Sequence, residues 1–329
     1  FERGTVLSQS VQLKAEPATP PVTVALKSEQ PKADPSESKP ATRLEMVNAV
    51  WVQKTYPFSE KYLGFLRDGY RAFSREVDFQ EDPAYSCNLI NDWVKKNTDG
   101  RIQKLLTEDA ISADSRLVLT NTLYFQGLWE HPFPDNPETL QWKTGNQTKS
   151  VPSMSRKETF NYKENDLYQA VELPYQDSHL AMVLLLPKPE ISWEKFCSTL
   201  RTSGFGKALT GFEKKPVEIT MPKFRIETKL SLKEILSPSM PLAFMDSDET
   251  DFSPMVEGDG RLKISAVVHQ AFIDVDNLGT KAGAATVAAF VTKNQRPVIF
   301  EADRPFVFAL HDRNSKAILF LGHLVHPEG

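Results

Sequence analysis

The sequence is poor in cysteine, in long apolar runs and in excess charge of one sign. Its 329 residues include two cysteines, and 39 basic against 43 acidic residues leave a formal net charge of −4. So small a net charge gives no general attraction to nucleic acid or to anionic membranes, and we expect neither as a partner. No apolar run approaches the roughly 18–20 residues that span a bilayer, so we expect a soluble protein.

The two cysteines, Cys87 and Cys197, each lie in a segment with helical character. They can be interpreted as one disulfide or as two separate, partly buried thiols, and we favour the thiols. Neither cysteine has the spacing of a metal site, and the six histidines have no metal-ligand spacing either. We therefore expect no metal and no cofactor.

Motifs of the common catalytic sites are also missing. The sequence contains no Gly-x-Ser-x-Gly elbow, no His-Glu-x-x-His helix, no Gly-x-x-x-x-Gly-Lys-Ser/Thr phosphate loop and no Gly-x-Gly-x-x-Gly after a strand. His269 stands among apolar residues in a strand-like segment, where a lone histidine is usually a hydrogen-bonded core residue rather than a catalytic one. We therefore expect that the protein is not an enzyme, and in particular not a hydrolase.

The first 43 residues differ in character from the rest. The chain begins at Phe1 without an initiator methionine or a signal peptide, and we interpret this as a start from which an N-terminal piece has been removed or was never recorded. Residues 15–43 hold six prolines among Lys, Glu, Ser and Ala: Pro17, Pro20, Pro21, Pro31, Pro35 and Pro40. Such a stretch buries too little apolar surface to offset its ordering entropy, so we expect it to be disordered or polyproline-like. The expected division is an N-terminal remnant at 1–43 and a folded domain at 44–329.

The folded part predicts helices and strands in mixed order. Helical spacing of apolar residues predicts one helix that follows a Ser59 cap and a second that ends near Gly100. Apolar and β-branched runs predict strands at 44–53, 117–125, 170–175, 180–186, 217–228 and 262–275, and several more within 298–325. Pro222 inside the 217–228 strand implies an edge or a bulge. This pattern is typical of an α+β fold, with helices toward the N-terminal half and strands toward the C-terminal half.

One segment, 279–289, is unusually rich in small side chains. It reads Gly-Thr-Lys-Ala-Gly-Ala-Ala-Thr-Val-Ala-Ala, which could form a flexible linker or a helix, since alanine favours helices. On a strand, the residues that share one face are all small enough to enter a packed sheet: Thr280, Ala282, Ala284, Thr286 and Ala288. We interpret the segment as a two-state element, able to exist as an exposed loop or as a central strand.

The residues around this segment form a set of motifs in a fixed order. The strand-like residues 264–275 precede the segment, and Ala302-Asp303-Arg304-Pro305-Phe306 follows it. The other motifs are Thr-Asn-Thr-Leu-Tyr-Phe-Gln-Gly-Leu-Trp at 120–129, Leu-Pro-Tyr at 173–175, Met-Pro-Lys-Phe at 221–224, Asp-Phe-Ser-Pro-Met at 251–255 and Phe-Leu-Gly-His-Leu at 320–324. Over residues 44–327 the sequence resembles the serpin family of serine protease inhibitors.

This resemblance implies a serpin-like α+β fold, with a large central, mostly antiparallel β-sheet, further sheets, helices packed around it and an exposed reactive loop at about 277–297. It implies that Asn121 and His269 form a hydrogen-bonded shutter where the sheet parts, and that Trp129 lies at the breach where the loop enters. The implied hinge residues are Gly279, Thr280, Ala282, Ala284, Ala285 and Thr286. Counting along the loop as in the family places the reactive bond at Lys293–Asn294, with Arg296 as the alternative cleavage residue.

The resemblance also implies a function, that of a suicide substrate for a serine protease. Cleavage of the loop would free its N-terminal part to enter the sheet while the protease is still attached. Lysine at the reactive bond fits a trypsin-like serine protease as partner in a covalent complex, and we expect the inhibitor to be a monomer. The alternative is a non-inhibitory serpin with a carrier, chaperone or structural role, for which a charged or proline-rich hinge would be typical.

Several positions depart from the family pattern. Asn277 and Leu278 stand where acidic residues are common, and Lys281 replaces a usual glutamate; we expect all of these to face solvent. The family's first helices, with their Ser-Pro-x-Ser motif at the shutter, have no match in residues 1–43, so we expect the chain to be N-terminally incomplete. Asn146 opens an Asn-Gln-Thr glycosylation sequon, which favours a secreted, extracellular glycoprotein.

Overall fold

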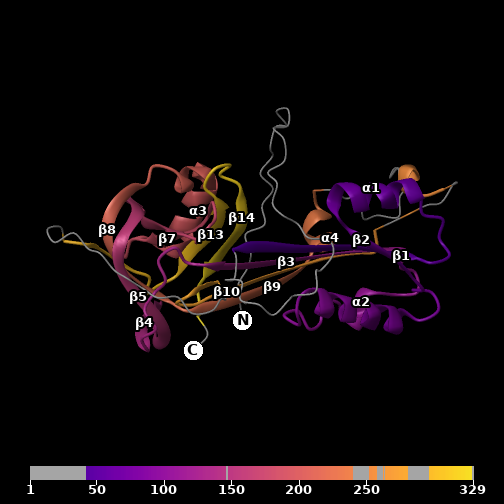
Figure 1. The fold of residues 1–329 in the computed structure, drawn as a ribbon, viewed down its shortest axis with the longest axis horizontal. Coiled ribbons are helices and arrows are strands. Elements are labelled where there is room, and N and C mark those ends of the chain that lie inside the picture. The colour runs from indigo at the N-terminus through magenta and orange to yellow at the C-terminus, as the bar shows by residue number, and fades with distance from the viewer. Residues whose placement is uncertain are drawn as a thin grey trace.

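The computed structural model describes residues 42–145, 147–239, 252–257, 262, 264–280 and 296–327. Helices pack around two β-sheets in this part of the chain (Figure 1). The α-helices are α1 (Glu60–Tyr70), α2 (Pro83–Asn97), α3 (Trp193–Ser203) and α4 (Leu232–Leu236). The expected α+β class is confirmed. The division at residue 43 stays a prediction, since residues 1–41 lie outside the described ones.

The first sheet, which we call the central sheet, contains two antiparallel pairs of long strands. In spatial order its strands are β2 (Phe73–Val77), β1 (Arg43–Gln53), β3 (Leu117–Leu128), β10 (Ala266–Val275) and β9 (Phe224–Ser231), and the short β11 (Gly279–Thr280) pairs with β3. β1 is antiparallel to β3, and β9 is antiparallel to β10, whereas β2 joins β1 in parallel. β3 and β10 run parallel to each other, and we call their junction the seam.

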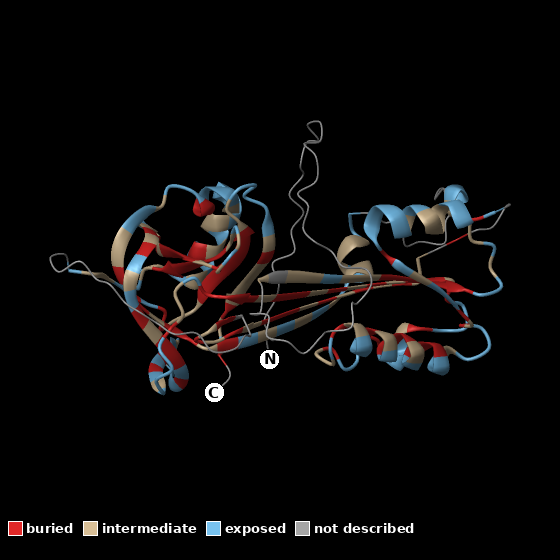
Figure 2. Ribbon diagram, in the orientation of Figure 1, coloured by how far each residue is buried: buried red, intermediate tan, exposed pale blue. Residues whose placement is uncertain are grey.

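The second sheet lies at one end of the central sheet (Figure 1). In spatial order its strands are β12 (Val298–Glu301), β8 (Glu213–Pro222), β5 (Gln147–Glu164), β6 (Tyr168–Pro174), β7 (Leu180–Pro187), β13 (Phe306–Asp312) and β14 (Ile318–Leu324), with β4 (Glu138–Thr144) paired to β5. β7 is buried along nearly its whole length (Figure 2). Its unbroken apolar sequence fits this position, because both faces of the strand are covered.

The two faces of the central sheet carry different cores. On one face, Trp51 of β1 packs with Ile90 and Val94 of α2. α2 forms there because its buried residues recur at helical spacing and because Asp82 caps its first turn by accepting a hydrogen bond from the Tyr85 N–H. The opposite face contributes to two separate apolar clusters, one toward α1 and one toward the second sheet.

The predicted single strand at 217–228 is wrong. β8 belongs to the second sheet and β9 to the central sheet, and the chain passes from one to the other at Lys223. Pro222 is the last residue of β8, which lies between β12 and β5, so the proline marks the end of a strand rather than an edge or a bulge. Among the described elements, strands occur in both halves of the chain, with β1 to β5 before residue 165 and the more numerous β6 to β14 after it, whereas the α-helices are divided equally between the halves.

Cys87 is buried in α2, and Cys197 is half-buried in α3. Both thiols are free, which confirms the interpretation as two separate thiols. Burial raises the pKa of each thiol, so neither is activated as a nucleophile. Among the helices that the structure describes, none is long and apolar enough to cross a membrane.

Candidate functional site

The residues just before the small-residue segment are tied to the end of β3. The Trp129 N–H donates to the Leu278 carbonyl at 3.0 Å, and the Phe133 N–H donates to the Asn277 carbonyl at 2.8 Å. The indole Nε1 of Trp129 also donates to the Asp276 carbonyl at 3.0 Å. The chain therefore turns back after β10 and starts along β3 in the antiparallel direction, as β11.

Asp276 closes the turn between β10 and β11. Its Oδ1 accepts hydrogen bonds from the N–H groups of Leu278 at 2.8 Å and Gly279 at 3.1 Å. Burial raises the pKa of Asp276, although these two N–H groups act in the opposite direction. A carboxylate that accepts hydrogen bonds from the backbone two and three residues ahead fixes a tight turn. The backbone directly before the predicted hinge is therefore held in one conformation.

Gly279 occupies a position that only glycine fits. Its φ of +150° is one that L side chains rarely adopt, and a Cβ there would lie 2.1 Å from the Gly127 carbonyl oxygen. Gly127 is itself crowded, because a Cβ on it would lie 2.8 Å from the Tyr175 ring. The missing side chain of Gly279 thus allows β11 to approach β3 closely where the small-residue segment begins, and that of Gly127 leaves room for the Tyr175 ring.

Trp129, the residue predicted to lie at the breach, contacts this turn. It is 1% exposed and stacks on Tyr175 with ring centroids 4.5 Å apart. Its hydrogen bonds to Asp276 and Leu278 connect the end of β3 to the base of the hinge. Its role as the breach residue stays a prediction.

The expectation that Asn277 faces solvent is wrong. Asn277 is 8% exposed, because its carboxamide joins two neighbouring segments. Its Oδ1 accepts from Lys223 Nζ at 3.2 Å, and its Nδ2 donates to Asp135 Oδ1 at 3.3 Å. Leu278 is half-buried, and Lys281 lies outside the described residues.

Asn121 and His269, the predicted shutter residues, face each other across the seam. They are register partners on β3 and β10, and His269 Nδ1 lies 2.5 Å from Asn121 Oδ1. Burial lowers the pKa of His269, so its imidazole is neutral at neutral pH. A neutral amide–imidazole hydrogen bond therefore spans the junction between the two halves of the sheet.

Asn48 of β1 is a residue that sequence reasoning missed. Its Oδ1 accepts a hydrogen bond from Asn121 Nδ2 at 2.5 Å, which extends the shutter contact across a third strand. A signal was present in the sequence, because Asn48 is the one amide in the alternating set Leu44, Met46, Asn48, Val50 and Val52. A polar residue in the middle of an apolar face needs a partner.

The remaining predicted site residues take no part in the side-chain contacts described above. For Thr280 the structure describes the backbone in β11. Arg296 is exposed just before β12. The other predicted residues lie outside the described ones: Ala282, Ala284, Ala285, Thr286, Lys293, Asn294 and the sequon residue Asn146. The roles assigned to all of these residues stay predictions.

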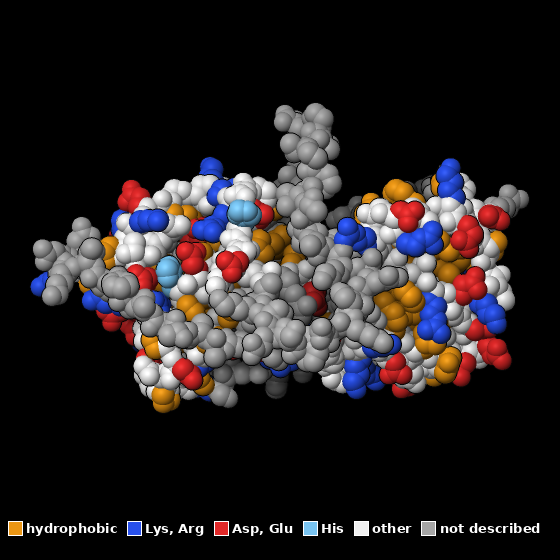
Figure 3. Space-filling view, viewed as in Figure 1, with side chains coloured by type: hydrophobic (Ala, Val, Ile, Leu, Met, Phe, Trp, Pro, Cys, Tyr) orange, Lys and Arg blue, Asp and Glu red, His pale blue; other side chains and the backbone are white. Residues whose placement is uncertain are grey.

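The described residues contain no group of three or more His, Cys, Asp or Glu side chains that could hold a metal ion. On the face shown in Figure 3, Lys and Arg side chains alternate with Asp and Glu, and the coloured part has no broad area of one sign.

Comparisons with known proteins point to one family. The chain is similar to an uncharacterized serpin-like protein of Thermococcus kodakarensis, with 38% identity over 292 residues that cover 87% of this chain and 67% of that protein. It is similar to human antithrombin-III, with 33% identity over 294 residues that cover 87% of this chain and 63% of that protein. The chain thus spans about two thirds of the length of these curated relatives.

The fold is similar to that of solved serpins. The crystal structure of native protease nexin-1 with heparin matches with a TM-score of 0.77 and 28% identity, covering 87% of this chain and 78% of that chain. The expected serpin-like fold is confirmed. A family model described as serpin (serine protease inhibitor) matches residues 13–327. The chain therefore belongs to the serpin family, whose members are protease inhibitors rather than enzymes.

Proposed function

We propose that this chain is an inhibitory serpin that traps a trypsin-like serine protease by inserting its cleaved loop into the seam. The observation that carries the proposal is the direction of three strands. β3 and β10 are parallel, and β11 starts along β3 in the opposite direction, directly after β10 ends. A strand that continued from β11 between β3 and β10 would run antiparallel to both.

Insertion of such a strand would change the kind of pairing in the sheet. From β1 to β9, every strand would then be antiparallel to its neighbours, because β1–β3 and β10–β9 already are. Parallel pairing is slightly less stable per residue than antiparallel pairing, and the new strand would form two ladders in place of one. The free energy gained from these ladders and from burial is the proposed driving force for insertion. While the loop is uncut its segment cannot enter the sheet, so the native state is kinetically stable.

The side chains of the loop suit this change. The alternating set at Thr280, Ala282, Ala284 and Thr286 is small, so no bulky side chain on that face would oppose entry into the sheet. Besides the backbone ladder between β3 and β10, which the two new ladders would replace, the side-chain contact that must break is the neutral hydrogen bond between Asn121 and His269. A neutral hydrogen bond contributes only about 0.5–1.5 kcal/mol net, so this side-chain contact adds little to the cost of opening the seam.

The trapping step follows from covalent attachment. The protease serine attacks the Lys293 carbonyl carbon, the peptide bond to Asn294 breaks, and the amine leaves with a proton while the acyl-enzyme remains. About 14 residues at ~3.3 Å each would then carry the attached protease about 45 Å along the sheet. Displacement of catalytic groups by even ~1 Å can cost about a hundredfold in rate, so hydrolysis of the acyl-enzyme stalls.

Secretion and glycosylation at Asn146 are part of the same proposal. The residues on either side of Asn146, Gly145 and Gln147, are exposed, and Thr144 pairs with Gln147 at the end of the β4–β5 hairpin. Hairpin ends are accessible to modifying enzymes. Treatment of the protein from a secreting eukaryotic host with an endoglycosidase would lower its mass, whereas an Asn146→Gln variant would show no such change.

The experiment that tests inhibition mixes the protein with trypsin and separates the products on a denaturing gel. We expect a covalent band at the summed mass for the wild type and for Arg296→Ala, and its loss in Lys293→Ala. Arg296 is a matched control because it is an exposed basic residue near the same end of the loop. Simple cleavage near Lys293 would contradict trapping and favour a non-inhibitory serpin. Absence of both cleavage and complex would overturn the assigned reactive bond.

A further inference from the structure

Asn48, Asn121 and His269 form a polar row across three strands of the central sheet. Asn48 is the register partner of Asn121 on β1 and β3, and Asn121 is the register partner of His269 on β3 and β10. Asn121 Nδ2 donates to Asn48 Oδ1, and Asn121 Oδ1 faces His269 Nδ1, each at 2.5 Å. All three side chains are half-buried. We call them the amide row.

The amide row interrupts an otherwise apolar face of the sheet. Toward the second sheet, Leu123 and Ile273 belong to one apolar cluster. Toward α1, Val50 and Leu117 belong to another. At the amide row, the side chains of neighbouring strands are therefore joined by hydrogen bonds instead of by apolar packing.

The orientation of the Asn121 carboxamide determines which nitrogen of His269 carries the proton. With Asn121 Oδ1 turned toward the imidazole, Nδ1 must be the protonated nitrogen, because the oxygen can only accept. The reversed carboxamide would present its NH₂ group and would require the other tautomer. Asn48 favours the first orientation as long as its own Oδ1 faces Asn121, because that oxygen accepts from the NH₂ group of Asn121.

His269 also lines an apolar groove of about 270 Å³ between the central sheet and β14. The wall of this groove includes Ile226, Ile273, Phe308 and Leu321. In such apolar surroundings a ring N–H without a partner is unfavourable, whereas an N–H on Nδ1 has the Asn121 oxygen as its acceptor. The Nδ1–H tautomer avoids that cost, so the orientation that Asn48 favours is also the one that suits the groove.

We propose that Asn48 is a positioning residue for loop insertion, which rests on the proposed function. Asn48 holds the Asn121 carboxamide on the β1–β3 side of the seam, so that opening of the seam breaks one side-chain bond of the amide row, the one to His269, besides the backbone ladder between β3 and β10. Asn121 then stays oriented while the cleaved loop enters. Without Asn48 the carboxamide takes both orientations, the seam opens less uniformly, and insertion competes less well with hydrolysis of the acyl-enzyme.

The test compares Asn48→Ala with Asn48→Asp in the full chain. Aspartate keeps an oxygen that can accept from Asn121 Nδ2, whereas alanine has none, so the aspartate variant is the conservative rescue. Met46→Ala is the matched control, because Met46 is 42% exposed on the same face of β1 and has no polar group. Far-UV circular dichroism establishes the fold first. If Asn48→Ala does not fold, Asn48→Ser replaces it, since its hydroxyl is too short to reach Asn121.

Two measurements are made on each variant. Heteronuclear NMR of the imidazole nitrogens reports the tautomer of His269, and titration against trypsin reports how many inhibitor molecules are consumed for each enzyme trapped. We expect the Nε2–H tautomer to appear in Asn48→Ala and the number consumed to rise about fivefold, the factor that corresponds to one net hydrogen bond. Asn48→Asp and Met46→Ala should match the wild type in both measurements.

The outcomes separate this inference from the proposed function. A wild type that forms no covalent complex with trypsin overturns the proposed function, and this inference with it. A wild type that traps trypsin, with an Asn48→Ala variant unchanged in either the tautomer or the number consumed, overturns this inference alone. Failure of Asn48→Asp to restore both measurements also overturns it, because the accepting oxygen would then be irrelevant.

Discussion

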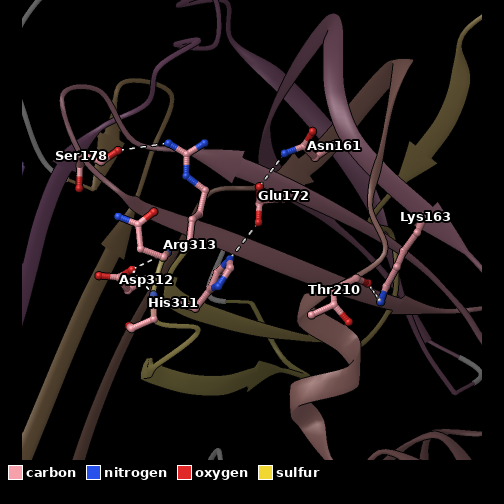
Figure 4. Close-up of polar contacts among 10 residues, drawn as sticks. Asn161, Lys163, Glu172, Ser178, Thr210, His311, Asp312 and Arg313 are labelled. Carbon is pink, nitrogen blue, oxygen red and sulfur yellow. Dashed lines mark hydrogen bonds and ion pairs between the residues drawn. The ribbon is translucent and has the colours of Figure 1, made fainter. Parts of the chain in front are cut away.

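His269 lies in the central sheet and His311 in the second sheet. The side chain that contacts His269 is neutral, whereas the one that contacts His311 is a carboxylate. His269 is half-buried and contacts the neutral carboxamide of Asn121 across the seam. His311 is fully buried on β13, and its Nε2 lies 3.0 Å from the Glu172 carboxylate on β6 (Figure 4). Asn161 of β5 donates to the other oxygen of Glu172 at 2.7 Å. One histidine thus bridges a junction with a neutral bond, and the other belongs to a buried polar cluster with a carboxylate.

The difference follows from what each sheet has to do in the proposed mechanism. A buried carboxylate that loses its partner is left with an uncompensated charge, so Glu172, His311 and Asn161 hold β5, β6 and β13 in one arrangement. The contact between Asn121 and His269 can be exchanged for other neutral hydrogen bonds at little cost. Ionic polar clusters fix a sheet, whereas neutral ones allow it to part.

The largest expected effect is the loss of stability in Glu172→Ala. Removal of the carboxylate leaves the buried side chains of His311 and Asn161 without their acceptor, and each buried polar group left unsatisfied costs about 1–3 kcal/mol. Urea unfolding should show this decrease in the free energy of unfolding. The control is Glu218→Ala at an exposed position of β8, where we expect a change within ~0.5 kcal/mol. Equal losses of unfolding free energy in the two variants would contradict the claim that the Glu172 cluster holds β5, β6 and β13 in one arrangement.

A smaller effect is expected in the pH dependence that Glu172 adds to stability. Burial by itself would raise the pKa of Glu172, but the hydrogen bonds from His311 and Asn161 outweigh it and hold the pKa below its ordinary value of 4.5. The stabilisation is therefore present above the ordinary value and is lost as the pH falls through the lowered value in the folded state.

This dependence can be measured as the difference in unfolding free energy between the wild type and Glu172→Gln. We expect the pH-dependent part of that difference to be on the order of 1 kcal/mol and to shrink as the pH falls below 4.5. A difference that grew on acidification would mean that the carboxyl is bound in its protonated form instead.

The smallest effect is expected for Asn121→Asp, which gives His269 a carboxylate partner like that of His311. This variant places a carboxylate beside His269, so the pKa of the imidazole should rise and the seam contact should become ionic. For a half-buried pair the new contact contributes about 1 kcal/mol or less to native stability, and the loss of the bond from Asn121 Nδ2 to Asn48 acts against this contribution. We also expect less efficient trapping of trypsin. NMR titration of His269 checks the first expectation. Unchanged trapping despite a raised pKa would show that seam opening does not limit insertion.

Much of the fold could be predicted from the sequence, because apolar alternation and helical spacing are local signals. The strand predicted at 117–125, which is β3 in the structure, and the helix predicted after Ser59, which is α1, are examples. The crossing at Lys223 was missed although the alternation changes phase there, from Val217, Ile219 and Met221 to Phe224 and Ile226. A shift of one residue in a period of two is the mark of a change of face or of sheet.

The site could be predicted only where motifs carry it. Asn121, His269, Trp129 and Gly279 were identified through the family resemblance. His311 and Glu172 were not, because their contact joins positions 139 residues apart and depends on the order β6–β7–β13 of the second sheet. Asn48 was missed although it interrupts an apolar alternation, because the sequence shows that such a residue needs a partner but does not show that the partner is Asn121 on β3.

The most direct test of the central claim is the thermal stability of the protein after a single cut in the loop. If the freed segment becomes a strand between β3 and β10, it should stabilise the fold by several kcal/mol, and the Tm should rise by roughly 10 °C or more. The inserted segment should also resist further proteolysis. A cut protein that unfolds at the same temperature as the intact one, with the segment still open to digestion, would contradict the account.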